Sequence, residues 1–321
     1  MGMHNNYLKK TDTILIIGKS PPPIGGVTIH VSRLCQHLKR VGHGFKYYDL
    51  KNGATVKLAK LILMTNNAHL HSSNTILKLI FVIFCKIAQT KSIITLHADL
   101  NRFGSVKVAI EKVIIIIATV PLVLNHDTYI QASRLNKNAK MVTAFFPPLQ
   151  VLALDSKIKV DLENILKQKK ILCTNAFDVT FDNYGKEIYG LSELLIACEV
   201  QSEYVLVISD PSGNYQRFIR RKSPALLHNA YWISTPHSFY EVLKLSTAFV
   251  RNTTTDGDSL SVREALFLGK LTFATDVVCR PDGIVLYKSV KEIFQNKGIQ
   301  PEQLPSYSLE LVVDEYTKIY G

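Results

Sequence analysis

Two carboxylates, Asp256 and Glu264, lie eight positions apart in a stretch whose residue types could bind a phosphorylated sugar. Between them Ser259, Leu260 and Ser261 precede apolar residues at helical spacing, so a helix is predicted to begin here. The free N–H groups of a helix's first turn and the helix dipole both favour an anion such as phosphate. Carboxylates accept hydrogen bonds from sugar or ribose hydroxyls. The spacing therefore predicts a site that holds a nucleotide diphosphate and a polyol together.

A purely structural interpretation of these carboxylates is also open. Ser261 and Glu264 have the spacing of a capping box, in which the glutamate would only close the helix start. Asp256 lies in a polar segment, where an aspartate commonly forms a turn with its own backbone. Asp256-Gly257-Asp258 also fits the Asp-x-Asp pattern that binds a divalent metal. Because the pattern lies deep in the second half of the chain and leads straight into a helix, we expect no metal there.

The elements that must position this site are a strand, a loop, a helix and a second strand. An apolar run ends at Val250, and residues 251–258 lack the periodicity of either regular element, so they are predicted to form a loop. Gly269 stops the helix. A strand over 271–274 follows at once.

Both halves of the chain alternate between strands and helices. The predicted strands are residues 13–17, 45–48, 68–71, 92–96, 120–124, 140–146, 170–174, 204–208, 230–233, 248–250 and 271–274. Such alternation indicates parallel sheets. With 321 residues the chain also exceeds the size at which one core keeps growing. We therefore predict an α/β protein of two domains, residues 1–150 and 151–305.

Polar residues follow the predicted strands of the first half, at the sheet edge where ligands of such folds bind. Gly25 and Gly26 end a proline-rich loop and open a helix, so their backbone N–H groups can approach a ligand. His71, His97 and Asp99 follow two later strands. A glycine pair can instead merely allow a tight turn, and a histidine at a strand end can be a cap. The residues alone leave both interpretations open.

The stretch 250–287 resembles the donor site of retaining GT-B glycosyltransferases of family four, many of which build bacterial surface polysaccharides. Asp256 and Glu264 stand at the two acidic positions of the Glu-x7-Glu motif of these enzymes. Further matching strings are Arg251-Asn252-Thr253, Asp256 to Ser259, Arg263 to Leu266, Ala274-Thr275-Asp276, Arg280 to Gly283 and, in the first half, Gly25 to Val31.

The resemblance implies two Rossmann-like domains whose parallel sheets face each other across a cleft. It also implies a last helix, within 306–321, that crosses back to the first domain. The resemblance also implies roles for single residues. Asp256 and His97 contact the transferred sugar, Glu264 holds the nucleotide ribose, and the N–H groups of Ser259, Leu260 and Ser261 hold the diphosphate. Gly25 and Gly26 assist donor binding, and His71 and Asp99 lie on the acceptor side.

One part of the family pattern is missing from this sequence. Many relatives carry an arginine and a lysine on the loop after the first strand of the second domain, where they hold the donor diphosphate. Here Tyr189 precedes Gly190 at the usual lysine position, and the loop has no arginine. The resemblance leaves Lys186, Arg251 or Arg263 to supply the positive charge.

Charge and cysteine content restrict the partners and the compartment. The 38 Lys and Arg residues against 26 Asp and Glu give a net charge of +12, which implies an anionic partner. The basic residues are scattered and follow no nucleic-acid-binding signature, so we expect no nucleic acid. The five cysteines form no Cys-x-x-Cys pair and indicate reduced thiols. With no apolar signal segment before the first strand, a cytoplasmic protein is predicted.

Two apolar runs, residues 76–88 and 109–124, raise the question of membrane contact. A spanning helix needs about 20 apolar residues, whereas the first run carries Lys78 and Lys86 and the second is broken by Pro121. We predict no spanning segment. A lysine-bearing apolar helix can instead lie on anionic lipid, so we predict peripheral contact with the inner face of the plasma membrane, with burial in the core as the alternative.

The leading functional prediction is a retaining glycosyltransferase of the hexosyltransferase class. It would move a sugar from a nucleotide-diphosphate donor to a polysaccharide or lipid-linked oligosaccharide in the synthesis of lipopolysaccharide or capsule, with no cofactor. A nucleotide-sugar epimerase of the same fold is one alternative. The other is a non-catalytic subunit that binds sugar nucleotide or lipid, since an aspartate stands in the first acidic position and the arginine–lysine pair is missing.

Overall fold

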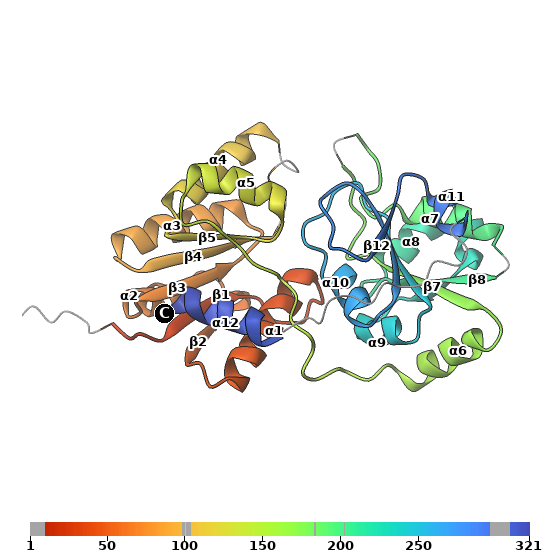
Figure 1. Ribbon diagram of the computed structural model, residues 1–321, viewed down its shortest axis with the longest axis horizontal. Coiled ribbons are helices and arrows are strands. Elements are labelled where there is room, and N and C mark those ends of the chain that lie inside the picture. The colour runs from red at the N-terminus through yellow and green to blue at the C-terminus, as the bar shows by residue number, and fades with distance from the viewer. Residues whose placement is uncertain (1–9, 98–99, 101–103, 183, 202, 296–308) are drawn as a thin grey trace, which may run out of the picture. The chain divides into compact units, whose positions relative to one another are not determined.

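The computed structural model describes residues 10–97, 100, 104–182, 184–201, 203–295 and 309–321. The chain divides into two compact units: unit 1 comprises Met1–Phe146 with Ser308–Gly321, and unit 2 comprises Pro147–Tyr307. Each unit contains one parallel sheet with helices on both faces (Figure 1).

The sheet of unit 1 has six strands in the order β2-β1-β3-β4-β5-β6, all parallel. The elements of this unit are β1 (Ile14–Gly18), α1 (Gly26–Arg40), β2 (Phe45–Asp49), η1 (Leu50–Asn52), α2 (Val56–Leu63), β3 (Asn67–His71), α3 (Thr75–Ile87), β4 (Lys91–Leu96), α4 (Ser105–Ile117), β5 (Val120–Val123), α5 (His126–Leu135), β6 (Lys140–Met141) and α12 (Leu309–Tyr320).

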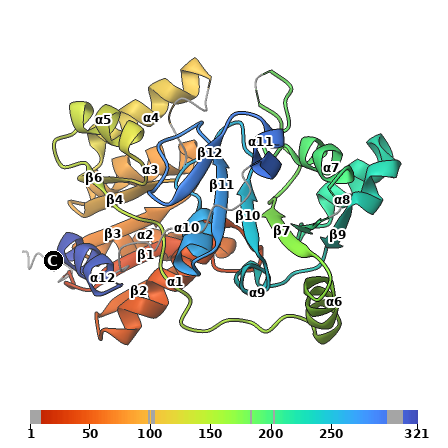
Figure 2. The ribbon, with the colours of Figure 1, turned by 45° about the vertical axis from the view of Figure 1, so that its right-hand side comes forward.

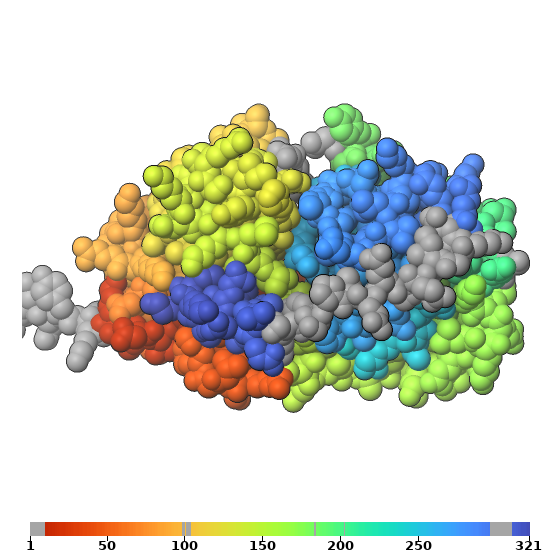
Figure 3. Space-filling model, viewed as in Figure 1, coloured from red at the N-terminus to blue at the C-terminus, as the bar shows by residue number. Residues whose placement is uncertain are grey.

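Two apolar layers cover the two faces of this sheet. The α2, α3, α4 and α5 helices pack their apolar residues on one face, whereas α1 and α12 pack on the other. Figure 3 shows α12, in blue, at the surface of unit 1. Tyr316 and Tyr320 of α12 are buried in this second layer, and Tyr316 donates a hydrogen bond to the Thr143 carbonyl (3.0 Å). The end of the chain therefore completes the core of the first unit.

Unit 2 repeats the plan, with six parallel strands in the order β12-β11-β10-β7-β8-β9 (Figure 2). Helices α7, α8 and α11 cover one face of the sheet, and α6, α9 and α10 cover the other. The elements are α6 (Ser156–Leu166), β7 (Lys170–Asn175), α7 (Leu191–Glu199), β8 (Tyr204–Ser209), α8 (Asn214–Lys222), η3 (Pro224–Asn229), β9 (Ala230–Ile233), α9 (Phe239–Lys244), β10 (Ala248–Arg251), α10 (Leu260–Phe267), β11 (Leu271–Thr275), β12 (Ile284–Tyr287) and α11 (Val290–Gln295).

The predicted α/β class with two parallel sheets is confirmed, but the strand predicted over 140–146 is wrong for most of its length. Only its first two residues, Lys140 and Met141, pair in the sheet, as the β6 strand. Four of the other five residues, Val142, Ala144, Phe145 and Phe146, are buried and apolar, a pattern that predicts a strand. Side chains of α1 take the place of a neighbouring strand, because His30 Nδ1 and Arg33 Nη1 donate to the carbonyls of Ala144 (2.6 Å) and Phe146 (3.1 Å).

Candidate functional site

The site predicted in the second half is built where β10 ends and α10 begins. Arg251 is the last residue of β10, and the loop after it reaches Ser259, which is the N-cap of α10. The Ser259 hydroxyl accepts from the Val262 N–H (3.5 Å) and lies 3.2 Å from the Ser261 hydroxyl. Ser261 is therefore a residue of the first helical turn, and the capping box proposed for Ser261 and Glu264 is wrong.

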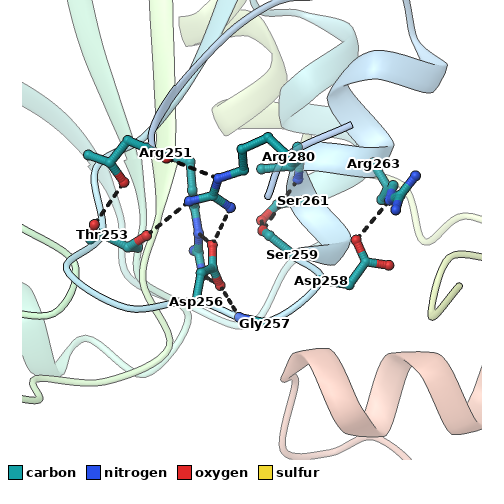
Figure 4. Close-up of polar contacts among 11 residues, drawn as sticks. Arg251, Thr253, Asp256, Gly257, Asp258, Ser259, Ser261, Arg263 and Arg280 are labelled. Atoms are coloured by element: carbon teal, nitrogen blue, oxygen red, sulfur yellow. Dashed lines mark hydrogen bonds and ion pairs between the residues drawn. The ribbon is translucent and has the colours of Figure 1, made fainter. Parts of the chain in front are cut away.

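Asp256 is buried between two arginines (Figure 4). Arg251 donates from Nε to Oδ2 (2.9 Å) and from Nη2 to Oδ1 (3.0 Å), in a bidentate pair. Arg280 donates from Nη1 to Oδ2 (2.8 Å), and the Gly257 N–H donates to Oδ1 (3.1 Å). Burial acts to raise the pKa of Asp256, but the two guanidiniums outweigh it and hold that pKa below its usual value. The carboxylate is thus ionised and its oxygens are engaged by four donors.

Arg280 is fixed by more than this ion pair. Its Nε donates to the Thr275 carbonyl (3.0 Å) and its Nη2 to the Thr253 hydroxyl (3.4 Å). Two guanidiniums and one carboxylate leave this group of three side chains with a net charge of +1. The group lies in the same loop region as the N-terminus of α10, where the helix dipole adds to the positive potential. The arrangement favours an anion.

The other charged residues of this region are placed differently. Arg263, a candidate for the diphosphate charge, donates from Nε to Asp258 Oδ1 (2.8 Å) (Figure 4). Glu264 lies in α10 and is only 5% exposed. Lys186 lies in an exposed turn, where its backbone N–H donates to Asp182 Oδ1 (2.9 Å).

The loop between β7 and α7 lies against this site. The Arg251 guanidinium carbon lies 5.2 Å from the ring centroid of Tyr189, a cation–π contact at the position where relatives carry a lysine. The Thr254 N–H donates to the Ile188 carbonyl (3.0 Å). Lys186 belongs to this loop but is exposed; of the other two candidates for the missing charge, Arg251 is the one that the structure brings to the loop.

Asn252 holds the start of α7 in place. Its buried amide donates to the Gly190 carbonyl (3.0 Å) and to Glu193 Oε2 (3.3 Å), and its Oδ1 accepts from the Tyr287 hydroxyl (3.0 Å). Gly190 has φ of 50°, and a Cβ there would overlap the Asn252 amide. This position therefore requires glycine for two independent reasons.

In unit 1, Gly25 is the N-cap of α1 and Gly26 its first residue. Gly25 has an extended backbone (φ −161°), and a Cβ on Gly26 would meet no atom within 4 Å. Gly25 is therefore not required by a left-handed backbone, and Gly26 has room for a side chain. The Gly25 N–H donates to the Thr28 hydroxyl (3.1 Å). The predicted approach of a ligand to this helix start stays a prediction.

Histidines gather at the carboxyl ends of the β3 and β4 strands. His71 Nδ1 lies 3.3 Å from His97 Nε2, and the His30 ring centroid lies 5.0 Å from that of His71 and 5.5 Å from that of His97. His69 bridges the Tyr320 and Thr95 hydroxyls (2.9 and 2.8 Å). Burial, and then the neighbouring histidines, hold the pKa of His71 and of His97 well below the usual value, so both imidazoles are neutral. Asp99 lies outside the described residues.

Sequence reasoning selected His71 and His97 but missed His30 and His69, and it missed Arg280 as a partner of Asp256. Arg280 stands in the matched string Arg280 to Gly283 and His30 in Gly25 to Val31, so the resemblance held a signal for both. Within the described residues, no group of three or more His, Cys, Asp or Glu side chains is arranged to hold a metal ion.

The sequence matches no protein-family model and no curated protein sequence. Solved structures do match. HepE of Anabaena in complex with UDP is 12% identical over 96% of this chain and 92% of that chain, with a TM-score of 0.64. A sucrose-phosphate synthase of Thermosynechococcus elongatus is 13% identical over 96% and 89%, with a TM-score of 0.62.

A UDP-forming α,α-trehalose-phosphate synthase of Burkholderia xenovorans, in complex with glucose-6-phosphate, is 10% identical. The match covers 96% of this chain and 99% of that chain, with a TM-score of 0.62. These glycosyltransferases have the GT-B fold, and the likeness extends along nearly the whole of the present chain. The protein therefore has the GT-B fold.

Proposed function

We propose that the protein is a retaining glycosyltransferase that moves a hexose from a nucleotide-diphosphate donor to a glycan or lipid-linked acceptor in cell-surface polysaccharide synthesis. The observation that carries this proposal is the likeness to GT-B glycosyltransferases over 96% of the chain. The donor motif with Asp256 and Glu264 supports it at the level of residues. The reaction would take place in the cytoplasm, with the protein resting on the inner face of the plasma membrane.

Donor binding is assigned to the start of α10 and the loop before it. The N–H groups of Leu260 and Ser261 would bind the diphosphate, since the first turn of a helix has no internal partners for them. The charge of the missing arginine–lysine pair would come from Arg251, because Asp256 and the Tyr189 ring fix its guanidinium. Glu264 would accept the ribose hydroxyls.

The engagement of Asp256 by four donors adds a second role to its proposed contact with the transferred sugar. A carboxylate offers about four lone-pair sites, and Arg251, Arg280 and Gly257 already use that number. A sugar hydroxyl would have to share one of them. We therefore propose that Asp256 chiefly orients the two arginines toward the donor. In unit 1, His97 would contact the sugar, with His71 and Asp99 on the acceptor side.

Incubation with nucleotide sugars tests the proposal. UDP-glucose comes first, because one HepE structure is a complex with it. We expect slow release of UDP without acceptor, faster release with a matching acceptor, and a product that keeps the anomeric configuration of the donor. Activity should survive EDTA, since arginines already neutralise the Asp256 and Asp258 carboxylates that would have to bind a cation.

Other outcomes would replace the proposal. Conversion of the donor sugar without UDP release would indicate an epimerase. Binding without any turnover across a panel of donors and acceptors would indicate a non-catalytic subunit, and loss of activity in EDTA with recovery in manganese would assign a metal to the Asp256–Asp258 segment.

A further inference from the structure

The outer surface of the α3 and α4 helices in unit 1 is apolar and exposed. On α3 the exposed residues Ile76, Ile80, Ile83 and Ile87 follow spacings of four, three and four, so they form one stripe. On α4 the exposed apolar residues are Val106, Val113 and Ile116. Each of the seven side chains is at least 42% exposed.

This stripe is separate from the core-facing side of the same helices. Phe81, Val82 and Cys85 of α3 and Ile114 and Ile115 of α4 fill the apolar layer between these helices and the sheet. The helices are therefore apolar on both sides, whereas a helix at a water-facing surface is polar on its outer side. Contiguous exposed apolar surface of this kind marks a contact with another apolar body.

A buried ion pair joins the two helices and removes the acidic residue from their surface. Lys78 Nζ of α3 lies 2.6 Å from each carboxylate oxygen of Glu111 of α4, and the Thr75 hydroxyl also donates to Glu111. Glu111 is the only acidic residue in the α2, α3 and α4 segments, and it is 0% exposed. The pair makes the two outer faces parts of one surface and leaves no carboxylate on it.

The charges that do reach solvent on these three helices are positive. Lys57 and Lys60 of α2, Lys86 of α3 and Lys112 of α4 are exposed. An apolar stripe bordered by lysines complements an anionic lipid surface, where isoleucines enter the acyl boundary and lysines meet the headgroups. A second copy of the chain fits less well, because face-to-face packing would bring the lysines of both copies together.

We propose that the α3–α4 face, the seven exposed apolar residues with Lys86 and Lys112, binds the surface of an anionic bilayer. Each of the two helices has 13 residues, against the roughly 20 that a spanning helix needs. Among the described residues, no helix combines the length and apolarity required to cross a membrane. The helices would therefore lie in the plane of the interface. The inference does not rest on the proposed transferase reaction.

Vesicle flotation of the full chain tests this face. The vesicles would be phosphatidylcholine alone, or equal parts of phosphatidylcholine and phosphatidylglycerol. We expect recovery with the anionic vesicles only, and weaker recovery as ionic strength rises from about 0.1 M to about 1 M, which shortens the Debye length from about 10 Å to about 3 Å. Ile80→Glu should weaken partitioning about tenfold or more, since it removes buried apolar area and adds repulsion.

Matched variants distinguish binding by this face from non-specific effects of net charge and of exposed apolar surface. Ile196→Glu on α7 changes an isoleucine of nearly equal exposure in unit 2 (57%, against 59% for Ile80) and should partition like the wild type. Lys86→Gln with Lys112→Gln should weaken partitioning about 25-fold, at about fivefold for each lysine. Lys157→Gln with Lys169→Gln on exposed positions of unit 2 removes the same charge and should have little effect.

Three results would overturn the proposal. The first is equal loss of flotation for Ile80→Glu and Ile196→Glu, and the second is no flotation of the wild type with either vesicle. The third is a wild-type dimer, seen by light scattering, that Ile80→Glu converts to a monomer without any change in vesicle recovery, which would assign the face to a second copy. Because flotation is measured without donor or acceptor, a negative flotation result does not contradict the proposed catalysis. A negative activity assay likewise does not contradict membrane binding.

Discussion

At the scale of single residues, the chemistry of the donor site depends on which partners a carboxylate already has. Asp256 is paired with two buried arginines, whereas Asp258 is paired with Arg263, whose side chain is 32% exposed. A buried charge that loses its partner costs several times more than an exposed one. The two neighbouring aspartates should therefore respond very differently to the same substitution.

Asp256→Asn should lower the free energy of unfolding by about 3 kcal/mol, because it leaves the buried Arg251 and Arg280 guanidiniums without a counter-charge. Asp258→Asn should cost less, about 1 to 2 kcal/mol, because the Asp258 side chain is only 5% exposed but the Arg263 side chain that it leaves without a counter-charge is 32% exposed. Urea unfolding of the two variants measures the difference. If Asp256→Asn is as stable as the wild type and loses only turnover, its main contact is the substrate.

The pH dependence of this effect follows from the lowered pKa of Asp256. A carboxylate with a depressed folded-state pKa stabilises the protein above its unfolded value, about 3.9, and loses that contribution as pH falls through the folded value. The stability gap between the wild type and Asp256→Asn should thus be constant above about pH 5 and shrink below about pH 4.

Glu264→Gln should weaken UDP binding by about 1 to 3 kcal/mol, because the amide keeps the size of the side chain but is a poorer acceptor for ribose hydroxyls. Titration calorimetry with UDP measures this loss. Glu203→Gln, at an exposed carboxylate of the same unit, is the control. An unchanged affinity together with lower stability would reduce Glu264 to a structural residue of α10.

The residues of the site were predictable where local spacing encodes them. Asp256 and Glu264 follow from a motif within one loop and one helix. The pairing of Asp256 with Arg280 joins the loops that follow β10 and β11 across 24 positions, and the His30–His71 contact joins α1 and β3 across 41. No local pattern expresses such contacts, so the real environment of Asp256 had to come from the fold.

At the scale of elements, the strands followed from short apolar runs between helical segments, because strands buried on both faces have that pattern. The exceptions lie at the sheet edges. The β12 strand has four residues, three of them half-exposed or exposed, and was not predicted. The segment after β6 has apolar burial without strand pairing. Whether a strand lies at a sheet edge, and whether side chains replace its backbone partners, is decided only when the sheet assembles, so local sequence does not predict it.

Two glycine substitutions test whether Gly190, in the turn before α7, is required by its backbone conformation alone or also by its packing against Asn252. Gly190→Ala combines a left-handed φ of 50° with overlap on the Asn252 amide, whereas Gly185→Ala has φ of 76° and no atom within 4 Å of the new Cβ. Gly185→Ala should cost about 1 kcal/mol from the backbone alone. Gly190→Ala should cost roughly 1 to 3 kcal/mol more, by urea unfolding. Equal losses would show that the Asn252 side chain moves aside freely.

At the scale of the whole molecule, the two units share one plan but are not equally continuous in sequence. Unit 2 is one segment of the chain, whereas unit 1 needs α12 from beyond unit 2. The resemblance to GT-B enzymes indicated where that helix packs. Composition and periodicity give two parallel sheets; they do not assign a distant helix to one of them.

Tyr316→Ala should therefore destabilise unit 1, by about 3 to 5 kcal/mol, since the side chain is fully buried against the first sheet. Tyr184→Ala, at a tyrosine that is 94% exposed, should change stability by less than about 0.5 kcal/mol. Hydrogen exchange can follow the units separately, because two units need not unfold together. Faster exchange in unit 2 alone would contradict the assignment of α12 to the unit 1 core.

The return of α12 to unit 1 also sets an order for folding during synthesis. When Phe146 has been translated, all six strands of the first sheet exist, yet one apolar face still lacks its last cover. That cover is made about 170 residues later, roughly 10 to 35 seconds at 5 to 20 residues per second. Unit 2 can be complete before unit 1 is. The first half of the nascent chain thus keeps a sheet face that is covered by α1 but not yet by α12 while the second half is being made, and a chaperone can bind the exposed part of that apolar face during this interval.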